Sequence, residues 1–494
     1  MLLLGIDVGT SSIKVSLVDA QSQQYIASAQ YPEYETPISS LKPGWAEQSP
    51  EMWWDHVQHA ILKMHKHQNY NPTDITAIGI AYQMHGLVAV DKNHHVLFDS
   101  IIWCDSRAVE TGGKAFQSIG EKKCLTHLLN SPGNFTAAKL GWVKKNKPDL
   151  YQQIDKIMLP GDFIAMKLTG EISTSISALS EGIFWDFKEN RLSEDILGYF
   201  NFDKDIIPQT KEVFSEHGKL KEDIADKLFL KAGIPVTYKS GDQPNNALSL
   251  NVLEPGEVAA TAGTSGVIYG VSDTLTYDKE SRVNTFAHVN HSTTQNRLGV
   301  LLCINGTGIL NRWVRDLMTP GSNYSKINAE AGKIKPGSEG LRVLPFGNGA
   351  ERMLKNKIVG AHFNNIDLNL HTQAHIFRAS QEGIAFAFRY GLDILRENGM
   401  NPTVIRAGKA NLFLSELFTE AFVNATQVPV ELYNCDGSVG AAIGAGIGAK
   451  IYNSSKEAFK NMAVIRVVQP AEKDVYEEYY QDWLKHLNKQ LKEV

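Results

Sequence analysis

The chain begins with two apolar runs separated by a short polar segment. The runs cover residues 2–6 and 13–18, and both have the pattern of core strands. The small residues between them are typical of a hairpin turn, in which Gly9 is free to take positive φ. Asp7 is the exception, because it ends the first run where a buried strand normally has Val or Ile.

The next part of the N-terminal half alternates helical and strand patterns. The predicted elements are a helix over 50–67 and strands over 75–82, 86–91 and 96–103. Residues 119–232 have a mostly helical pattern, including a helix over 136–148 that ends at a proline. Strands alternating with helices indicate an α/β protein.

The C-terminal half repeats the opening pattern. Residues 257–271 predict strand, turn and strand, and Gly-Thr-Ser at 263–265 matches the same triplet at 9–11. The repeat favours a duplicated α/β architecture with a boundary near residue 240. Residues 471–494 predict a surface helix whose aromatic stripe packs on the core.

Length and composition restrict the class of protein. At 494 residues the chain predicts two or three domains, and 43% hydrophobic and 21% charged residues are typical of a soluble globular protein. The net charge of −5, without a basic run longer than a pair, argues against nucleic acid or an anionic membrane as the main partner.

The cysteines and the N-terminus predict a cytoplasmic protein. The four cysteines are far apart and form no C-x-x-C pair, which favours a reducing compartment. The apolar N-terminus has no basic region before it and is interrupted by Asp7, so we do not expect a signal peptide. No apolar run is long enough to predict a membrane span.

Several common motifs are absent from the sequence. No Gly-Lys pair is followed by Ser or Thr, so there is no Walker A loop, and no histidine or cysteine spacing predicts a zinc site. Residues 440–449 are rich in glycine but lack the dinucleotide-binding spacing. We interpret them as a helix that packs closely on a neighbour through small residues.

The two Gly-Thr-Ser turns are suited to phosphate. Backbone N–H groups and hydroxyls in such turns form a concavity for phosphate oxygens. The residues concerned are Thr10 and Ser11 in the first turn, and Gly263, Thr264 and Ser265 in the second. Asp7 would repel a phosphate unless a hard cation lay between them, and Mg²⁺ held through water would meet that need. Alternatively, Asp7 only hydrogen-bonds the turn.

Asp242 is a candidate general base. It follows a glycine and precedes a predicted helix, near the proposed boundary between the halves. Phosphoryl transfer to an alcohol needs an acceptor for the hydroxyl proton, and an aspartate in a cleft can provide it. The alternative interpretation is an ordinary helix N-cap.

Polar residues at two strand ends are candidates for sugar binding. Met84 and His85 interrupt two apolar runs, and Trp103, Asp105 and Arg107 end another. An aromatic ring with a carboxylate and a guanidinium suits the apolar faces and hydroxyls of a sugar. The alternatives are a buried core histidine and a surface ion pair of little consequence.

Taken together, these motifs resemble the FGGY family of carbohydrate kinases, over nearly the whole chain and in the same order. The matching segments are GIDVGTSSIKVSLVD (5–19), GWAEQSPEMWW (44–54), YQMHG (82–86), IIWCDSRA (101–108), IMLPGDFIAMKLTGE (157–171), ATAGTSGV (260–267) and GAAIGAG (440–446). QMHG followed by W-x-D-x-R most resembles the xylulokinase branch.

The resemblance implies a fold and an activity. It implies two ribonuclease H-like domains of the actin/Hsp70/hexokinase superfamily, with the sugar mainly in residues 1–240, the nucleotide mainly in 241–494 and a catalytic cleft between them. It implies ATP and Mg²⁺ as cofactors and phosphorylation of D-xylulose at O5. Another sugar or polyol (ribulose, fuculose, rhamnulose or gluconate) and a sugar-binding regulator without catalysis are the alternatives. A homodimer is compatible with the sequence, which locates no interface.

The resemblance also assigns site residues. It implies that Asp242 is the base, that Asp7 faces Mg²⁺ and the phosphates, and that Met84 and His85 contact the sugar, with Trp103 and Asp105 as neighbours. The remaining assignments are Thr10 and Ser11 in the first phosphate turn, Gly263, Thr264 and Ser265 in the second, and Gly408, Lys409 and Asn411 at the nucleotide.

Three segments depart from the family pattern. Lys409 stands where the adenosine motif commonly has a glycine, which leaves the nucleotide preference open. The loop 347–357 keeps Glu351 and Arg352 but lacks the usual proline. Gln243 and Pro244 follow the candidate base where xylulokinases tend to have Asn and Ala.

Overall fold

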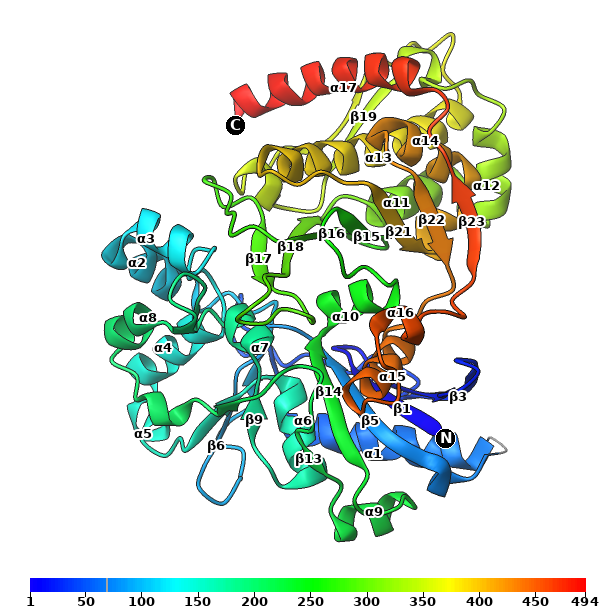
Figure 1. Cartoon of the computed structure of the whole chain (residues 1–494). Coiled ribbons are helices and arrows are strands. Elements are labelled where there is room, and N and C mark those ends of the chain that lie inside the picture. The colour runs from blue at the N-terminus through cyan, green and yellow to red at the C-terminus, as the bar shows by residue number, and fades with distance from the viewer. Residues whose placement is uncertain (68–69) are drawn as a thin grey trace.

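A computed structural model describes residues 1–67 and 70–494 and contains two large mixed sheets, each within its own lobe (Figure 1). The first sheet has the order β13 (Gly218–Lys219), β14 (Pro235–Gly241), β5 (Ile75–Tyr82), β1 (Leu2–Val8), β2 (Ile13–Asp19) and β3 (Tyr25–Tyr31). The second has the order β17 (Asn284–Ala287), β18 (Leu298–Ile304), β16 (Gly266–Ser272), β15 (Glu257–Ala262), β21 (Val404–Gly408), β22 (Val430–Tyr433) and β23 (Val464–Val468).

The two sheets share one topology. In the order β3-β2-β1-β5-β14, the pairs β3–β2 and β2–β1 are antiparallel, and β1–β5 and β5–β14 are parallel. The order β18-β16-β15-β21-β22 repeats these directions pair by pair. The duplicated α/β architecture predicted from the repeated hairpin is therefore confirmed.

Helices cover both faces of the first sheet. Alternate side chains of β1 point to opposite faces, so Leu2, Leu4 and Ile6 share a core with α1 (Pro50–His67), while Leu3 packs with α15 (Gly437–Gly448). α15 lies against β1, β5 and β14, although it comes from the far end of the chain. Helix α10 (Asp242–Ser249) packs on α15.

The glycines of α15 and of the strands beneath it permit this close approach. A Cβ at Gly5 would overlap the Ser438 carbonyl oxygen, and a Cβ at Gly79 would overlap that of Ala441. Gly444 and Gly448 meet β14 in the same way. The prediction that residues 440–449 form a helix packed through small residues is confirmed.

The second sheet is buried mainly by helices that lie between its later strands in sequence, together with one helix after its last strand. These are α11 (Gly308–Met318), α12 (Tyr324–Ala331), α13 (Gln373–Glu397), α14 (Glu416–Thr426) and α17 (Lys473–Glu493). On α17, Tyr476, Tyr480, Trp483 and Leu487 are buried in this core, as the aromatic stripe predicts. The strand pair β19 (Arg342–Phe346)–β20 (Gly360–Asn364) packs on α13 in the same lobe, whereas the short helix α16 (Ser455–Ala458) packs on α15 beside the first sheet.

A helical region extends from the side of the first lobe (Figure 1). Its helices are α2 (Val109–Ile119), α3 (Glu121–His127), α4 (Thr136–Asn146), α5 (Pro148–Tyr151), α7 (Ile176–Glu181) and α8 (Glu194–Phe200). By contrast, α6 (Pro160–Thr169) packs on β5 and β14 of the sheet, and α9 (Glu222–Leu228) packs on α1. Two-residue and three-residue strands also occur here: β4 (Glu47–Gln48), β6 (Val88–Val90), β7 (Ser100–Ile101), β8 (Lys156–Met158), β9 (Ser173–Thr174), β10 (Trp185–Asp186), β11 (Arg191–Leu192) and β12 (Gln209–Thr210).

The structure corrects two of the sequence predictions. The strands expected over 86–91 and 96–103 shorten to β6 and β7, because polar turns occupy most of the intervening residues. The stretch 119–232 is mostly helical but also contains short strand pairs, which are too brief to leave an alternating pattern.

All four cysteines are free thiols, as expected without a disulfide framework. Throughout residues 1–67 and 70–494, no helix combines the length and apolar character that a membrane crossing requires.

Candidate functional site

The first Gly-Thr-Ser turn connects β1 to β2 and is held by side chains. The Thr10 hydroxyl donates to Gln83 Oε1 at 3.1 Å, and Gln48 Nε2 donates to the Thr10 carbonyl oxygen at 2.8 Å. The indole Nε1 of Trp103 donates to the Thr10 hydroxyl at 3.0 Å. The structure thus brings a candidate sugar residue into contact with the first candidate phosphate turn, while Ser11 stays exposed beside it.

Asp7 and Asp242 are two carboxylates at neighbouring strand ends, and the charge of Asp7 acts on Asp242. Burial raises the pKa of Asp7 to about 6, with Asp436 as the second cause. Burial also raises the pKa of Asp242 to about 7, and the charge of Asp7 is the second cause. Val8, which follows Asp7, and Gly241, which precedes Asp242, both pair with Tyr82 of β5, so the two aspartates belong to one site at the ends of adjacent strands.

The simpler interpretations of these aspartates are not supported by the geometry. Asp242 is the first residue of α10, and the capping position is held by Gly241, so the N-cap interpretation is wrong. Asp7 lies across from Lys14 in the β1–β2 register. Among the described residues, no group of the β1–β2 turn donates a hydrogen bond to the Asp7 carboxylate. The interpretation that Asp7 only hydrogen-bonds the turn is therefore not supported.

The site fits a magnesium ion. A carboxylate with a raised pKa, beside a second carboxylate, is an environment that a hard divalent cation would stabilise. In residues 1–67 and 70–494, no cluster of three or more acidic, histidine or cysteine side chains forms a complete metal cage. Mg²⁺ needs no such cage, since it usually keeps several waters and takes phosphate oxygens as ligands. Asp7 would hold it, with Asp242 close by.

The second Gly-Thr-Ser turn connects β15 to β16 and is held through its carbonyl oxygens by the segment 307–309. The Thr307 hydroxyl and the Gly308 N–H both donate to the Gly263 carbonyl oxygen, at 3.0 and 2.9 Å. A Cβ at Gly308 would overlap that same oxygen, so only glycine fits there. The turn residues Thr264 and Ser265 remain exposed.

A cavity of about 380 Å³ opens beside the second turn. It lies between this turn, the start of α11 and the 3₁₀ turn Asn411–Leu414, and its lining includes Gly263, Thr264, Gly308, Asn311, Arg312, Tyr324 and Asn411. A second cavity of about 130 Å³ adjoins it and is lined by Gly408, Lys409 and Asn411, among others. The structure therefore brings the candidate nucleotide residues together.

Sequence reasoning missed the α11 side of this cavity. Gly308, Asn311 and Arg312 follow an Asn-Gly-Thr-Gly stretch at 305–308, directly after a buried strand. A glycine-rich segment between a strand and a helix is a recognised signal for anion binding and was available in the sequence.

The loop 347–357, which departs from the family pattern, contacts the segment 305–306 that leads into α11. The Glu351 carboxylate accepts hydrogen bonds from the N–H groups of Asn305 and Gly306, both at 3.0 Å. Burial raises the pKa of Glu351 to about 7. Glu351 thus fixes the segment that braces the second turn, and this contact does not depend on the missing proline.

Met84 and His85 form the other side of the site. Met84 is buried against the start of α10, where a Cβ at Gly241 would lie 2.7 Å from Met84 Cγ. His85 has φ +64°, and its ring centroid lies 4.8 Å from that of Phe135 and 5.5 Å from that of Phe286. Burial and the charge of Lys139 lower the pKa of His85 to about 3, so its ring is neutral.

Trp103 and Asp105 differ sharply in exposure. Trp103 is 53% exposed, whereas Asp105 is 0% exposed. The Asp105 carboxylate accepts from the Ala46 N–H at 2.6 Å and from Arg107 Nε at 2.8 Å. Its oxygens are therefore engaged, and we correct the expectation of a sugar contact: Asp105 holds the Trp103 turn in place. The pair with Arg107 is also not a surface pair, because both side chains are buried.

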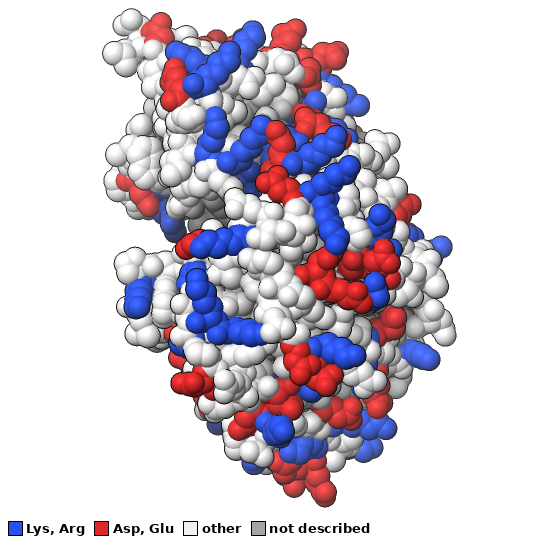
Figure 2. Space-filling view, turned by 90° about the vertical axis from the view of Figure 1, so that its left-hand side faces the viewer, with Lys and Arg blue, Asp and Glu red and all other residues white. Residues whose placement is uncertain are grey.

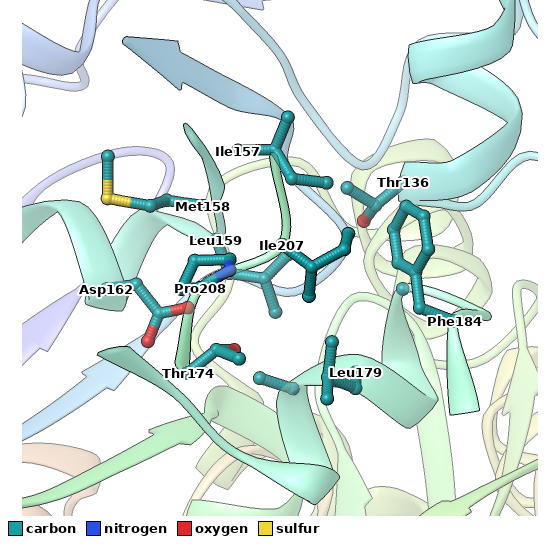
Figure 3. A pocket seen from close by; sticks show the side chains of 12 residues that line it. Thr136, Ile157, Met158, Leu159, Asp162, Thr174, Leu179, Phe184, Ile207 and Pro208 are labelled. Carbon is teal, nitrogen blue, oxygen red and sulfur yellow. The ribbon is translucent and has the colours of Figure 1, made fainter. Parts of the chain in front are cut away.

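A small internal cavity behind this region does not hold substrate. It measures about 20 Å³ and is lined mainly by apolar side chains, including Ile157, Leu179, Phe184 and Ile207 (Figure 3). That volume corresponds to about one water molecule, so a sugar has to bind elsewhere.

The outer surface has no dominant charge on the face seen in Figure 2. Lys and Arg side chains lie among Asp and Glu side chains over most of this face, and the surface is hollowed between the upper and lower lobes. Such mixed charge gives no long-range field of one sign.

Comparisons with known proteins agree with this geometry. The sequence model of the FGGY family of carbohydrate kinases, N-terminal domain, matches residues 2–249. The xylulose kinase of Escherichia coli (strain K12) is 28% identical over 451 residues, which cover 91% of this chain and 89% of that protein.

Solved structures share the whole fold. The xylulose kinase from Rhodospirillum rubrum has a TM-score of 0.88 at 24% identity, covering 99% of both chains. A gluconate kinase from Lactobacillus acidophilus has a TM-score of 0.89 at 21% identity, covering 99% of this chain and 98% of that one. These likenesses confirm the expected two-lobed fold of the actin and hexokinase type.

Proposed function

The chain belongs to the FGGY family of carbohydrate kinases, and on that premise we propose that it transfers the γ-phosphoryl group of ATP to O5 of D-xylulose. The observation that carries the proposal is the position of Asp7 and Asp242 at the ends of β1 and β14, the two strands that flank β5 in one sheet. Phosphoryl transfer to an alcohol needs an acceptor for the hydroxyl proton and groups that offset the phosphate charge, and we assign these roles to Asp242, to Asp7 and to the two Gly-Thr-Ser turns.

Asp242 is the proposed general base. As the sugar hydroxyl oxygen bonds to the γ-phosphorus, the bond from that phosphorus to the β–γ bridging oxygen breaks and ADP leaves. The hydroxyl proton passes to a carboxylate oxygen of Asp242. A pKa of about 7 suits this role, because a base works best when its pKa is near the operating pH.

The two turns would hold the phosphates. Thr10 and Ser11 would offer N–H groups and the Ser11 hydroxyl from the first lobe, and Gly263, Thr264 and Ser265 would offer N–H groups and hydroxyls from the second. Mg²⁺, when bound near Asp7, supplies positive charge that offsets the phosphate charge. Gly408, Lys409 and Asn411 lie at the adjoining cavities and are the proposed contacts to the nucleoside part.

Met84, His85 and Trp103 are the proposed sugar contacts. Trp103 offers an exposed indole face beside Thr10, and His85 lies next to Phe135 and Phe286. Xylulose as the substrate is supported by relatives named xylulose kinase that match most of the chain at 26–28% identity.

In this proposal the two substrates bind mainly to different parts of the chain. Residues 1–240 would carry the sugar site and 241–494 the nucleotide site, although α15 of the second segment packs on the first sheet. Closure of the lobes over the sugar would exclude water as a competing acceptor. A cytoplasmic location and a homodimer stay predictions.

The test is ADP release in Mg-ATP with a panel of sugars led by D-xylulose. Saturable turnover with D-xylulose, and much weaker turnover with ribulose, fuculose, rhamnulose and gluconate, is the expected result. Preference for another sugar would keep the mechanism and overturn the substrate. Sugar binding without ADP release would favour the regulator.

A further inference from the structure

Two buried charged side chains hydrogen-bond the backbone of His85, one at its N–H and one at its carbonyl oxygen. Its N–H donates to Glu181 Oε1 at 3.0 Å, and its carbonyl oxygen accepts from Lys139 Nζ at 2.8 Å. His85 has a φ of +64°, which is uncommon for a residue other than glycine and costs energy unless neighbours hold it. The two contacts explain how this conformation persists.

Lys139 also reaches the second sugar turn. Its ammonium donates to the Ile102 carbonyl oxygen at 3.0 Å, one residue before Trp103. One side chain of α4 therefore fastens the turn that carries His85 to the turn that carries Trp103. Both turns lie far from α4 in sequence, so this link exists only in the folded protein.

Placing Lys139 here is energetically costly. Its side chain is 0% exposed, and no carboxylate of the described residues forms an ion pair with it. Burial of the ammonium lowers the pKa of Lys139 to about 7. A methionine would fill this space without desolvating a charge, so packing alone does not account for a lysine.

Glu181 connects the same turn to the candidate base. This carboxylate, at the end of α7, is buried, and its Oε2 has no hydrogen-bond partner among the described residues. A Cβ at Gly241 would lie 2.8 Å from that oxygen, and Gly241 directly precedes Asp242. Glu181 therefore touches both the His85 peptide and the residue before Asp242.

We propose that Lys139 and Glu181 are positioning residues, which hold the His85 and Trp103 turns at a fixed distance from Asp242 and so set the affinity for the sugar. The proposal rests on the proposed function, because it assigns the sugar to these turns. Neither side chain is exposed to solvent, so each acts through the backbone that it holds. The helical region beside the first lobe thereby gains a role in sugar recognition.

The first experiment compares Lys139→Met with Lys144→Met. Lys144 is on the same helix and also donates to backbone carbonyls, those of Phe200 and Asn201, but away from both turns. Because displacement of a site by about 1 Å can cost 10²-fold, we expect the Lys139 variant to raise KM for D-xylulose at least about tenfold. KM for ATP should stay within about twofold, and Lys144→Met should change neither value.

The second experiment uses two changes at Glu181. Glu181→Gln keeps an oxygen that can accept from the His85 N–H, whereas Glu181→Leu removes it. We expect the leucine variant to raise the sugar KM and the glutamine variant to recover most of the wild-type value. This pair decides the proposal if Lys139→Met does not fold, which ATP binding and the melting temperature would reveal.

The outcomes separate the two proposals. If the wild type phosphorylates a sugar but Lys139→Met and Glu181→Leu keep its sugar KM, the positioning roles are wrong and the proposed function stands. Equal rises in both KM values would also overturn them, because they would indicate general damage. If the wild type phosphorylates no sugar, the proposed function fails and the positioning roles fail with it.

Discussion

The two Gly-Thr-Ser hairpins have the same place in two sheets of the same topology, yet they differ at one chemical position. In β1, Asp7 precedes the turn glycine by two residues, and in β15 the equivalent residue is Thr261. The first turn is held by side chains, from Gln48, Gln83 and Trp103. The second is held by the backbone N–H groups of Gly308 and Ile309 together with the Thr307 hydroxyl.

The difference between Asp7 and Thr261 indicates which of the two roles, folding or function, requires the carboxylate. Since the second hairpin forms with a threonine at this position, the fold does not require a carboxylate there. Burial raises the pKa of Asp7 to about 6, so keeping it ionised at neutral pH costs free energy. The fold does not need Asp7, and its burial costs free energy. We therefore infer that Asp7 serves the reaction rather than the fold.

Making the first hairpin like the second should have a large effect on activity. We expect Asp7→Thr to lower kcat by about 10²–10³-fold, because the site loses the carboxylate proposed to face Mg²⁺. ADP release at several Mg²⁺ concentrations measures it. Asp19→Asn, at the exposed end of β2, is the control, and an active Asp7→Thr enzyme would refute the role of Asp7.

Disturbing the backbone support of the second turn should affect ATP more than sugar. Gly308→Ala would place a methyl group against the Gly263 carbonyl oxygen, so the turn has to shift. We expect KM for ATP to rise about tenfold with little change in KM for the sugar. Gly198→Ala is the matched control, since a Cβ there meets nothing within 4 Å; unchanged ATP kinetics would contradict the assignment.

The burial of Asp242 should appear in the pH dependence of stability. Its pKa rises from 3.8 to about 7 on folding, so its stabilising contribution is complete below pH 3.8 and is lost as the pH rises through 7. We therefore expect Asp242→Asn to raise the Tm of the unliganded protein by about 2–4 °C at pH 8 and by less at pH 5.

Asp19→Asn is the control for this Tm measurement, because the pKa of Asp19 is lowered and not raised in the folded protein. Backbone N–H groups lower the pKa of Asp19, so removing its charge should bring no gain at pH 8. An equal change in Tm for Asp242→Asn at both pH values would show that the carboxylate is not buried in the unliganded protein as described.

The smallest effect is expected at Lys409. This side chain is exposed at the edge of the cavity of about 130 Å³. Restoring the common glycine with Lys409→Gly should change KM for ATP by less than about threefold, because an exposed charge contributes little in water. Competition between ATP and GTP would show whether Lys409 instead selects the nucleotide, which a larger shift would indicate.

Much of the fold was predictable because it leaves periodic patterns. The helix at 50–67, the paired hairpins and the small-residue helix α15 all follow from local spacing of apolar or small residues. The partner of α15 was not predictable, since nothing local indicates that it packs on the first sheet. The short strands of the lateral region also leave too few residues for a pattern.

The site was predictable where a residue breaks a pattern. Asp7 interrupts a buried strand, so the sequence alone raises a question about it. Lys139 and Glu181 lie within helical segments, where charged residues are usual, and only the tertiary structure reveals that they are buried. Asp105 misled for the same reason, because the sequence suggests a pair with Arg107 but does not reveal that both side chains are buried.

The central claim is that Asp242 accepts the proton of the sugar hydroxyl, and Asp242→Asn tests it most directly. The measurement is kcat for ADP release with D-xylulose, together with the affinity for the sugar by calorimetry. We predict a loss in kcat of at least about 10²-fold with sugar binding retained. Turnover close to that of the wild type would contradict the claim and remove Asp242 from catalysis.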